Sequence, residues 1–504
     1  MNRNNIWIHV GLATVLITIA AVLGQIDRWK AALRVPDGTE RSRIEKLAGD
    51  DDPIVKRSRP EVLVRFKHGV TWDQIRRITS ANHDRLTDEI EAVDGLSVID
   101  DLDNADAQTV ADQYAAMTAL VDYAEPNFKI KLDDPSQTEI PRDLVYRESE
   151  IDHPNDPHFG EQWALHNLGQ DGGKQRADID ALEAWQTTQG SEDVVVAVLD
   201  TGVDYTHVDL RENMWIRPEG MAPYHDAELG YFDDLNGFDG TNAFSGLNYN
   251  SDSDADGEAG VGERESEPMD PMDDNGHGTH CAGIIGAEGD NGEGVAGINW
   301  HVKIMPLKFL GRGGFGSVDD AIEAINYAID RKEHGVNIRI ISASWGSTMK
   351  SKALEDTIRA AGDAGILFVA AAGNDSSNND KRAHYPSNYD LPNVISVAAL
   401  DRNDQLAGFS NYGVKTVHIA APGKDILSTW LNDDYREASG TSMATPYVSG
   451  VAALIVANEP NISMKKLRER LLNTADKLDA LDGKVATGGR VCAANALSNI
   501  VKQH

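Results

Sequence analysis

Apolar runs of strand length alternate with segments of helical spacing between residues 190 and 400, and few folds accommodate that alternation. The apolar runs cover residues 194–199, 302–310, 338–343, 366–372 and 394–399. Between them, segments 318–330 and 353–364 carry the spacing of helices that bury one face. Such alternation forms a parallel sheet covered by helices, with sites at the carboxyl ends of the strands. The sequence therefore predicts an α/β fold.

Three short strings lie at the ends of predicted elements and supply an acid, a base and a nucleophile. They are DTGVD at 200–204, NGHGTH at 275–280 and GTSMATP at 440–446. A serine hydroxyl attacks a carbonyl only when an imidazole takes its proton and a carboxylate orients the imidazole. Asp200, His277 and Ser442 are the candidates for these roles.

Each string alone also has a structural interpretation. Asp200 is typical of a turn at a strand end, and His277 of a cap or metal ligand at a helix start, although the spacing is not His-Glu-x-x-His. Ser442 could be the N-cap of a helix over 443–457. The conjunction of all three in the order Asp, His, Ser favours catalysis, because that order is the one found in subtilisin.

The three strings with their glycines resemble the subtilisin-like serine peptidases from about residue 155 nearly to the C-terminus. The resemblance implies a three-layer catalytic domain over 155–504. It also implies that Asn374, at the end of the 366–372 strand, donates to the oxyanion together with the backbone N–H of Ser442. The alternative for Gly373-Asn374 is a plain turn.

The resemblance assigns substrate binding to two further segments. The glycine-rich stretch 310–317, with Gly313 and Gly314, and the run Ser344-Trp345-Gly346 are similar to the strands that pair with an extended peptide. His384 precedes Tyr385-Pro386 and falls near the base of the primary pocket, where it would narrow the pocket or add polarity. A surface histidine without a role is the alternative.

Upstream, residues 59–132 predict a small ferredoxin-like α+β domain in the order βαββαβ. Strands are expected at 61–67, around 86–93, at 95–100 and at 121–131, and helices at 71–82 and 107–120. The end of this segment resembles the propeptide of subtilisin-like enzymes, which implies an intramolecular folding aid and inhibitor. An accessory domain is the alternative, and the polar linker 133–154 is where processing is expected.

The N-terminal 30 residues have the features of a targeting segment. Residues 6–24 are largely apolar, Arg3 precedes them, and a polar linker follows over 31–58. This layout is typical of an export signal, with an uncleaved membrane anchor as the alternative. We expect a secreted, cell-surface or periplasmic protein.

The charge balance excludes several partners. Among 504 residues, 81 are acidic and 47 basic, for a net charge of −34, so nucleic acid and anionic membranes would repel the chain. A membrane contact is expected only through the N-terminal segment, and the expected state is a monomer. Cys281 and Cys492 allow at most one disulfide, and Cys281 is interpreted as a small buried hydrophobic residue.

Acidic residues cluster in an insertion at about 241–272. There Asp252, Asp254, Asp256 and Glu263 have the spacing of an EF-hand calcium loop, although the flanks are not helical. A solvated acidic insertion is the alternative.

The resemblance implies a second calcium site. Its ligands would be Asp156, Asp209 and Asn291, with backbone carbonyls from the loop that holds Gly289, Glu293 and Val295. Oxygen ligands in such numbers suit Ca²⁺ better than a transition metal.

Together these features predict a secreted, calcium-stabilised serine endopeptidase that hydrolyses polypeptides and is made as an autoprocessed zymogen inhibited by its own propeptide. Two alternatives remain: a catalytically silent calcium-binding surface protein, and a processing protease of narrow specificity.

Overall fold

The computed structural model describes residues 61–103, 105–132, 136–139, 153–226, 230–241 and 270–499. The expected signal or anchor, the first linker and the EF-hand-like set Asp252, Asp254, Asp256 and Glu263 lie outside the described residues. Within the described ranges, no helix combines the length and the hydropathy that crossing a membrane requires.

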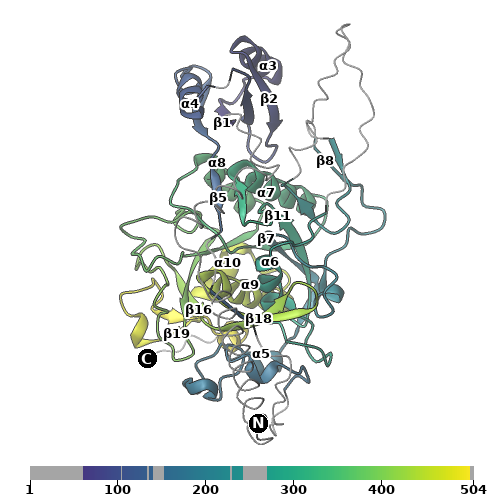
Figure 1. Cartoon of the computed structure of the whole chain (residues 1–504), viewed down its shortest axis with the longest axis vertical. Helices are drawn as coiled ribbons and strands as arrows, with labels where there is room; N and C mark the ends of the chain where they lie inside the picture. Colours follow the sequence, from purple (N-terminus) through teal and green to yellow (C-terminus); the bar gives the residue numbers. More distant parts are fainter. Residues whose placement is uncertain are drawn as a thin grey trace, which may run out of the picture. The chain divides into compact units, whose positions relative to one another are not determined.

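A nine-stranded sheet forms the centre of the large subdomain, residues 153–499 (Figure 1). Its order is β10-β11-β7-β13-β14-β15-β16-β20-β19. All neighbours are parallel except β19 and β20 at one edge. The strands are β7 Gly190–Asp200, β10 Phe238–Asp239, β11 His301–Lys308, β13 Ile338–Ala343, β14 Leu367–Ala371, β15 Val394–Leu400, β16 Ile419–Pro422, β19 Asp476–Lys477 and β20 Gly489–Arg490. The predicted α/β class is confirmed.

Side chains of the central strands alternate between two hydrophobic cores. Along β7, Val194, Val196 and Val198 pack on one face with helices α6 and α9, whereas Val195, Ala197 and Leu199 pack on the other with α7 and α8. The sheet is therefore the middle of three layers. The helices are α5 Ala181–Trp185, α6 His277–Gly286, α7 Val318–Glu333, α8 Lys352–Asp363, α9 Thr441–Asn458, α10 Met464–Asn473 and α11 Ala493–Ser498.

Shorter elements complete the large subdomain. Hairpin β17 Ile426–Trp430 and β18 Asp434–Ser439 pairs with β6 Ser136–Glu139, and β8 Tyr224–Asp226 pairs with β9 Gly230–Phe232. Strand β12 Phe315–Ser317 lies just before α7. Single 3₁₀ turns span Phe159–Glu161, Gln170–Gly172, Arg211–Asn213 and Asp479–Leu481.

The N-terminal subdomain, residues 61–132, has the predicted βαββαβ order. Its elements are β1 Glu61–Phe66, α3 Trp72–Ala81, β2 Asp84–Glu89, β3 Leu96–Asp101, α4 Ala107–Ala115 and β4 Val121–Pro126. The strands form an antiparallel sheet in the ferredoxin-like order β2-β3-β1-β4.

Three predicted boundaries in this subdomain are wrong. The second strand ends at Glu89 because residues 90–96 close a tight turn, with Val93 donating to Ile90 and Leu96 donating to Val93. The second helix ends at Ala115 rather than at 120. The last strand is two strands, since β5 Lys129–Lys131 leaves the sheet and pairs with β12 of the large subdomain.

Candidate active site

The carboxylate of Asp200 and the imidazole of His277 meet in the core of the large subdomain. Asp200 is the last residue of β7, at the carboxyl end of a central strand, and His277 is the first residue of α6. The Nδ1 atom of His277 lies 2.7 Å from Oδ1 of Asp200, and both side chains are fully buried. The contact leaves Nε2 as the nitrogen with which the ring can exchange a proton.

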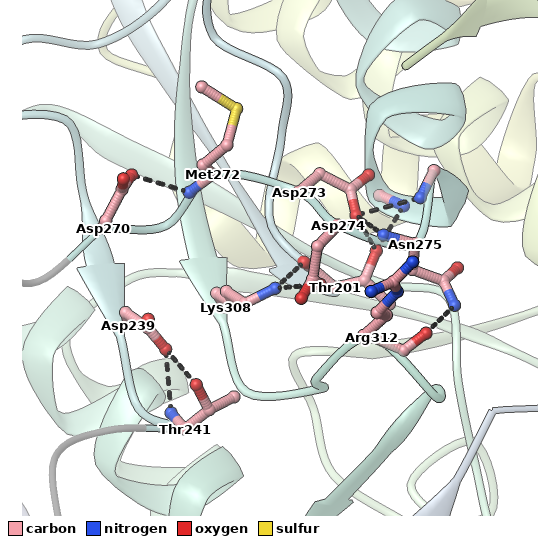
Figure 2. A network of polar contacts seen from close by, with 12 residues as sticks. Thr201, Asp239, Thr241, Asp270, Met272, Asp273, Asp274, Asn275, Lys308 and Arg312 are labelled. Carbon is pink, nitrogen blue, oxygen red and sulfur yellow. Dashed lines mark hydrogen bonds and ion pairs between the residues drawn. The ribbon is translucent and has the colours of Figure 1, made fainter. Parts of the chain in front are cut away.

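Asp273 fixes the start of the helix that carries His277 (Figure 2). One carboxylate oxygen accepts the backbone N–H groups of Asn275 and Gly276 at 2.9 and 3.0 Å. The other accepts the backbone N–H and the hydroxyl of Thr279 at 3.0 and 2.6 Å. These four donors, all from residues 275–279, hold this turn in a single geometry around one buried carboxylate.

Thr201 connects this clamp to the catalytic strand. Its hydroxyl donates to Asp273 at 2.9 Å and accepts the backbone N–H of Gly278 at 2.9 Å. The ammonium of Lys308, at the end of β11, donates to the Thr201 carbonyl at 2.6 Å and to Asp274 at 2.8 Å (Figure 2). Thr201 directly follows Asp200, so this network sets the position of His277 relative to Asp200. Sequence reasoning missed these residues, although the acidic pair before NGHGTH was visible.

Ser442 lies in the first turn of α9, whose N-cap is Gly440, so the interpretation of Ser442 as a helix N-cap is wrong. Its hydroxyl donates to the backbone carbonyl of Ser344 at 2.9 Å, and the Ser344 hydroxyl donates to the Ser442 carbonyl at 2.8 Å. Ser344 follows strand β13, which places the serine at the same end of the sheet as Asp200.

Cys281 links α6, which carries His277, to α9, which carries Ser442. It lies one turn after His277, is buried, and its thiol lies 3.5 Å from the Ser442 carbonyl oxygen. The Sγ atom and the side-chain ligand atoms of Asp200 and His277 all lie within 4.8 Å of one another. Burial raises the pKa of the Cys281 thiol well above its usual range. Cys281 and Cys492 are both buried and not paired, and the interpretation of Cys281 as a packing residue agrees with its burial.

Asn374 is held beside the nucleophile. Its side-chain oxygen accepts the backbone N–H of Thr441 at 2.8 Å and the Thr441 hydroxyl at 3.0 Å. A carbon one bond from the Cα of Gly440 would lie 3.5 Å from the Ser442 nitrogen and 3.6 Å from Nδ2 of Asn374. The Ser442 nitrogen and Nδ2 of Asn374 therefore both lie near one point beside Gly440.

His384 is buried rather than on the surface, so the surface alternative is wrong. A methyl group added to Gly346 would overlap the His384 ring, and one added to Gly373 would lie 2.9 Å from it. The imidazole thus fills the space between these two glycines, one beside Trp345 and the other beside Asn374. Burial lowers the pKa of His384 to about 4, so the ring is neutral above that pH.

Chain segments of the protein itself lie along the expected substrate strands. Strand β5 pairs antiparallel with β12, and the Leu132 N–H donates to the Gly314 carbonyl at 2.7 Å. Ile130 and Leu132 are buried in the core that contains Trp345. Gly313, adjacent to Gly314, lies under the ring of Phe315. Beyond this, β6 pairs with β18, which ends three residues before Ser442.

The expected ligands Asp156, Asp209 and Asn291 also come together. Asp209 accepts the Asn291 amide at 2.9 Å and the Val295 backbone N–H at 2.9 Å, while one oxygen of Asp156 accepts the Asp290 N–H at 2.8 Å. The other Asp156 oxygen is buried and has no hydrogen-bond partner among the described residues. Burial raises the pKa of Asp156 to about 6 and, with the charge of Asp156 adding to burial, that of Asp209 to about 7. Two crowded carboxylates with an orphaned oxygen fit a bound cation.

A parallel α/β sheet with a buried carboxylate–imidazole pair at one strand end and a serine opening a buried helix defines a serine peptidase of the α/β type. The Subtilase family model matches residues 191–489, and the chain belongs to this family. The thermophilic serine proteinase of Bacillus sp. (strain AK1) is 34% identical over 379 residues, which are 75% of this chain and 73% of that protein.

A further relative and a solved structure are also serine proteases or proteases by name. The halolysin-like extracellular serine protease Nep of Natrialba magadii is 32% identical over 365 residues, 72% of this chain and 56% of its own length. A solved structure of a protease from Pseudoalteromonas arctica PAMC 21717 has a TM-score of 0.52 and 30% identity, covering 69% of this chain and 99% of that one. The protein is thus a serine endopeptidase.

Proposed function

We propose that this endopeptidase cleaves polypeptides through Asp200, His277 and Ser442, with Asn374 in the oxyanion hole, and that it is an exported zymogen stabilised by calcium. The observation that carries the proposal is the 2.7 Å contact between Asp200 and His277, in a helix that packs against the Ser442 turn.

In the proposed mechanism each of these side chains has one role. The Ser442 hydroxyl leaves the Ser344 carbonyl and attacks the substrate carbonyl while Nε2 of His277 takes its proton. Asp200 keeps the imidazole in one tautomer and stabilises its charged form. The negative oxygen of the intermediate is stabilised by Nδ2 of Asn374 and the Ser442 N–H. His277 then returns the proton to the leaving amine as the C–N bond breaks, and water, deprotonated by the same imidazole, hydrolyses the ester left on Ser442.

The inhibitory role of the N-terminal subdomain is supported by its tail. Strand β5 occupies the β12 edge, where an extended substrate would add, so the tail excludes substrate by the same backbone bonds. Glu125 supports the docked state by accepting the Ser351 hydroxyl at 2.6 Å and the Lys352 and Ala353 N–H groups at 2.9 and 3.1 Å at the start of α8. We expect the maturation cut within the linker 133–154.

Calcium is the cation that the second ligand set fits best, since every ligand on offer is an oxygen. Asp156, Asp209 and Asn291 would supply side-chain oxygens. The carbonyls of Gly289, Glu293 and Val295 accept no hydrogen bond within the described residues and would complete the shell. Export is supported by the apolar N-terminal stretch and by a relative whose name describes it as extracellular.

Narrow specificity is favoured by one observation, the His384 ring between Gly346 and Gly373. Because a neutral ring fills this space, the pocket has room only for small substrate side chains next to the scissile bond.

The proposal is tested by labelling the expressed chain with an organophosphonate probe and by following its autoprocessing. The wild type should be labelled and should lose its N-terminal subdomain. Ser442→Ala should show neither, whereas Ser498→Ala, a serine exposed on α11, should behave as wild type. Labelling or processing that persists in Ser442→Ala would refute the assignment, and an unlabelled wild type of native fold would favour a catalytically silent protein.

A further inference from the structure

The contact between the two subdomains buries carboxyl groups as well as apolar surface. Leu63, Ile90 and Val98 of the N-terminal subdomain share one hydrophobic core with Ile322 and Ile325 of α7. Ion pairing adds to this contact at another point, where Arg65 lies 2.5 Å from Asp356. The N-terminal subdomain therefore covers part of α7 and α8, and buried groups between them lose water on docking.

Asp88 is an unusual member of this contact. It belongs to β2, is fully buried, and follows a shift in the register of β2 against β3 between Leu86 and Asp88, an irregularity of the kind that redirects a side chain. Neither of its carboxylate oxygens accepts a hydrogen bond from another element. Burial raises the pKa of Asp88 well above its usual range, and the negative charges of Glu323, Asp226 and Glu91 add to the effect.

Glu323 is its counterpart on α7 and is fully buried too. It accepts the Tyr224 hydroxyl at 2.9 Å and the Asn326 amide at 3.4 Å. The same amide donates to Glu91 of the N-terminal subdomain at 2.6 Å, which ties the two subdomains at this point. Burial, followed by the charges of Asp226 and Glu91, raises the pKa of Glu323 well above its usual range.

Cations do not balance these charges. No ion pair joins Asp88 or Glu323 to a lysine, arginine or histidine within the described residues. Arg331, an arginine of the same region, lies over the Tyr224 ring at 5.5 Å and pairs with Asp330 and Asp234. Among the described residues, Asp88 and Glu323 also do not belong to any group of three potential ligands that lie close enough together to hold one metal ion.

We propose that Asp88 and Glu323 form a proton-dependent latch, in which carboxyl groups on both subdomains are neutral while the N-terminal subdomain is docked and loosen it as they ionise. The proposal rests on the inhibitory role given to this subdomain above. It adds the signal that regulates release: a rise in pH, such as a chain meets on leaving an acidic environment.

The direction follows from proton linkage. Undocking returns Asp88 and Glu323 to water, where carboxyl pKa values are about 4. The docked state binds more protons between that value and the raised docked values, so docking is fully stabilised below about pH 4 and weakens as pH rises through the docked pKa values. For each carboxyl group that stays protonated in the docked state but ionises in the undocked state, a rise of one pH unit weakens docking about tenfold.

The test uses the full chain with Ser442→Ala, so that no cleavage occurs whether or not the protein is a peptidase. Hydrogen exchange of residues 84–101 and 318–333, corrected for intrinsic rates, is measured at about pH 5 and about pH 8. Protection should fall at the higher pH by about tenfold or more. Asp88→Asn should flatten this dependence, and so should Glu323→Gln, which probes the latch from the other subdomain if Asp88→Asn fails to fold. The control Asp112→Asn, at an exposed position of α4, should keep the wild-type slope.

Equal protection at both pH values, or an unchanged slope in a folded Asp88→Asn or Glu323→Gln variant, would overturn the proposal. Restoration of protection at about pH 8 by added calcium, lost in the same variants, would also overturn it, because the cluster would then hold a metal ion rather than protons. Neither result depends on catalysis, so failure here is distinct from failure of the proposed function.

Discussion

The side-chain oxygen of Asn374 accepts both the backbone N–H and the hydroxyl of Thr441, at 2.8 and 3.0 Å, and this pair of bonds fixes the orientation of the Asn374 amide at the start of α9. In the proposed mechanism the donor is thereby fixed before a substrate binds, so no reorganisation is needed when charge develops.

Asn374→Asp keeps the oxygen that faces Thr441 and replaces only the donor. We expect kcat to fall by about 10²–10³ with KM little changed, the loss measured for the corresponding donor in subtilisin. Steady-state kinetics on a peptide substrate test this. Asn378→Asp, on the same loop, is the control, and an equal loss in both would show that the loop rather than the donor matters.

Asp273→Asn should slow catalysis without contact to substrate. An amide group in place of one carboxylate oxygen would face backbone N–H groups, so the turn before His277 would shift. We expect kcat to fall by about 10- to 100-fold, as small misplacements of a catalytic group do. Kinetics normalised to probe-labelled sites measure it, with Asp270→Asn as control. Full activity would remove Asp273 from the positioning network.

His384→Ala should widen specificity. Removing the ring opens the space between Gly346 and Gly373, so residues larger than alanine before the cut bond should gain in kcat/KM relative to small ones. Cleavage of a randomised peptide library by wild type, His384→Ala and the exposed control His334→Ala would show the change. An identical preference profile in all three would contradict the pocket assignment.

Calcium removal should destabilise the protein. A ligand present at 100 times its Kd adds about 2.7 kcal/mol to the free energy of unfolding, so a chelator should lower Tm by several degrees. Asp209→Ala should be less stable and insensitive to the chelator, while Asp193→Ala, an exposed residue of β7, should respond as wild type. A melting curve that a chelator leaves unchanged would exclude the site.

His280 should contribute to acid lability. Burial lowers its pKa from 6.5 to about 4, and this effect outweighs the hydrogen bonds from Nε2 to the carbonyls of Arg436 and Ile426, which favour the charged ring. The unfolded chain binds this proton first, so stability is lost as pH falls from about 6.5 through about 4, by about 3 kcal/mol in total.

His280→Gln keeps a donor for the two carbonyls and cannot be charged. Denaturant unfolding at about pH 7 and about pH 4.5 should therefore show a smaller acid loss in this variant than in wild type. The same loss in both would assign acid lability to other groups.

Sequence patterns predicted the elements better than the contacts between them. Strand 338–343 was predicted to the residue, since a buried strand bounded by polar residues has sharp ends. Asp200 and His277 were found because glycine-rich strings mark element ends. Asp273 and Thr201, 72 residues apart, were not, because hydrogen bonds between distant turns leave no periodic signal.

Glu323 illustrates a second limit of prediction from sequence, which concerns the burial of polar residues. On α7 it belongs to the polar face that the helical spacing predicts to be solvated, and Asp88 is one of several acids in a polar strand. Each becomes buried only when another part of the chain covers it, which no local pattern records.

The three residues of β12 have a consequence beyond recognition. While β5 is paired with β12, the backbone N–H and carbonyl groups on this edge of β12 form hydrogen bonds within the same chain. Removal of β5 would expose an unpaired strand edge, and such an edge can pair with the same edge of another chain. This edge is short and contains Gly316, which limits such self-association. If the N-terminal subdomain is released as proposed, its tail would protect a newly made chain from self-association until that release.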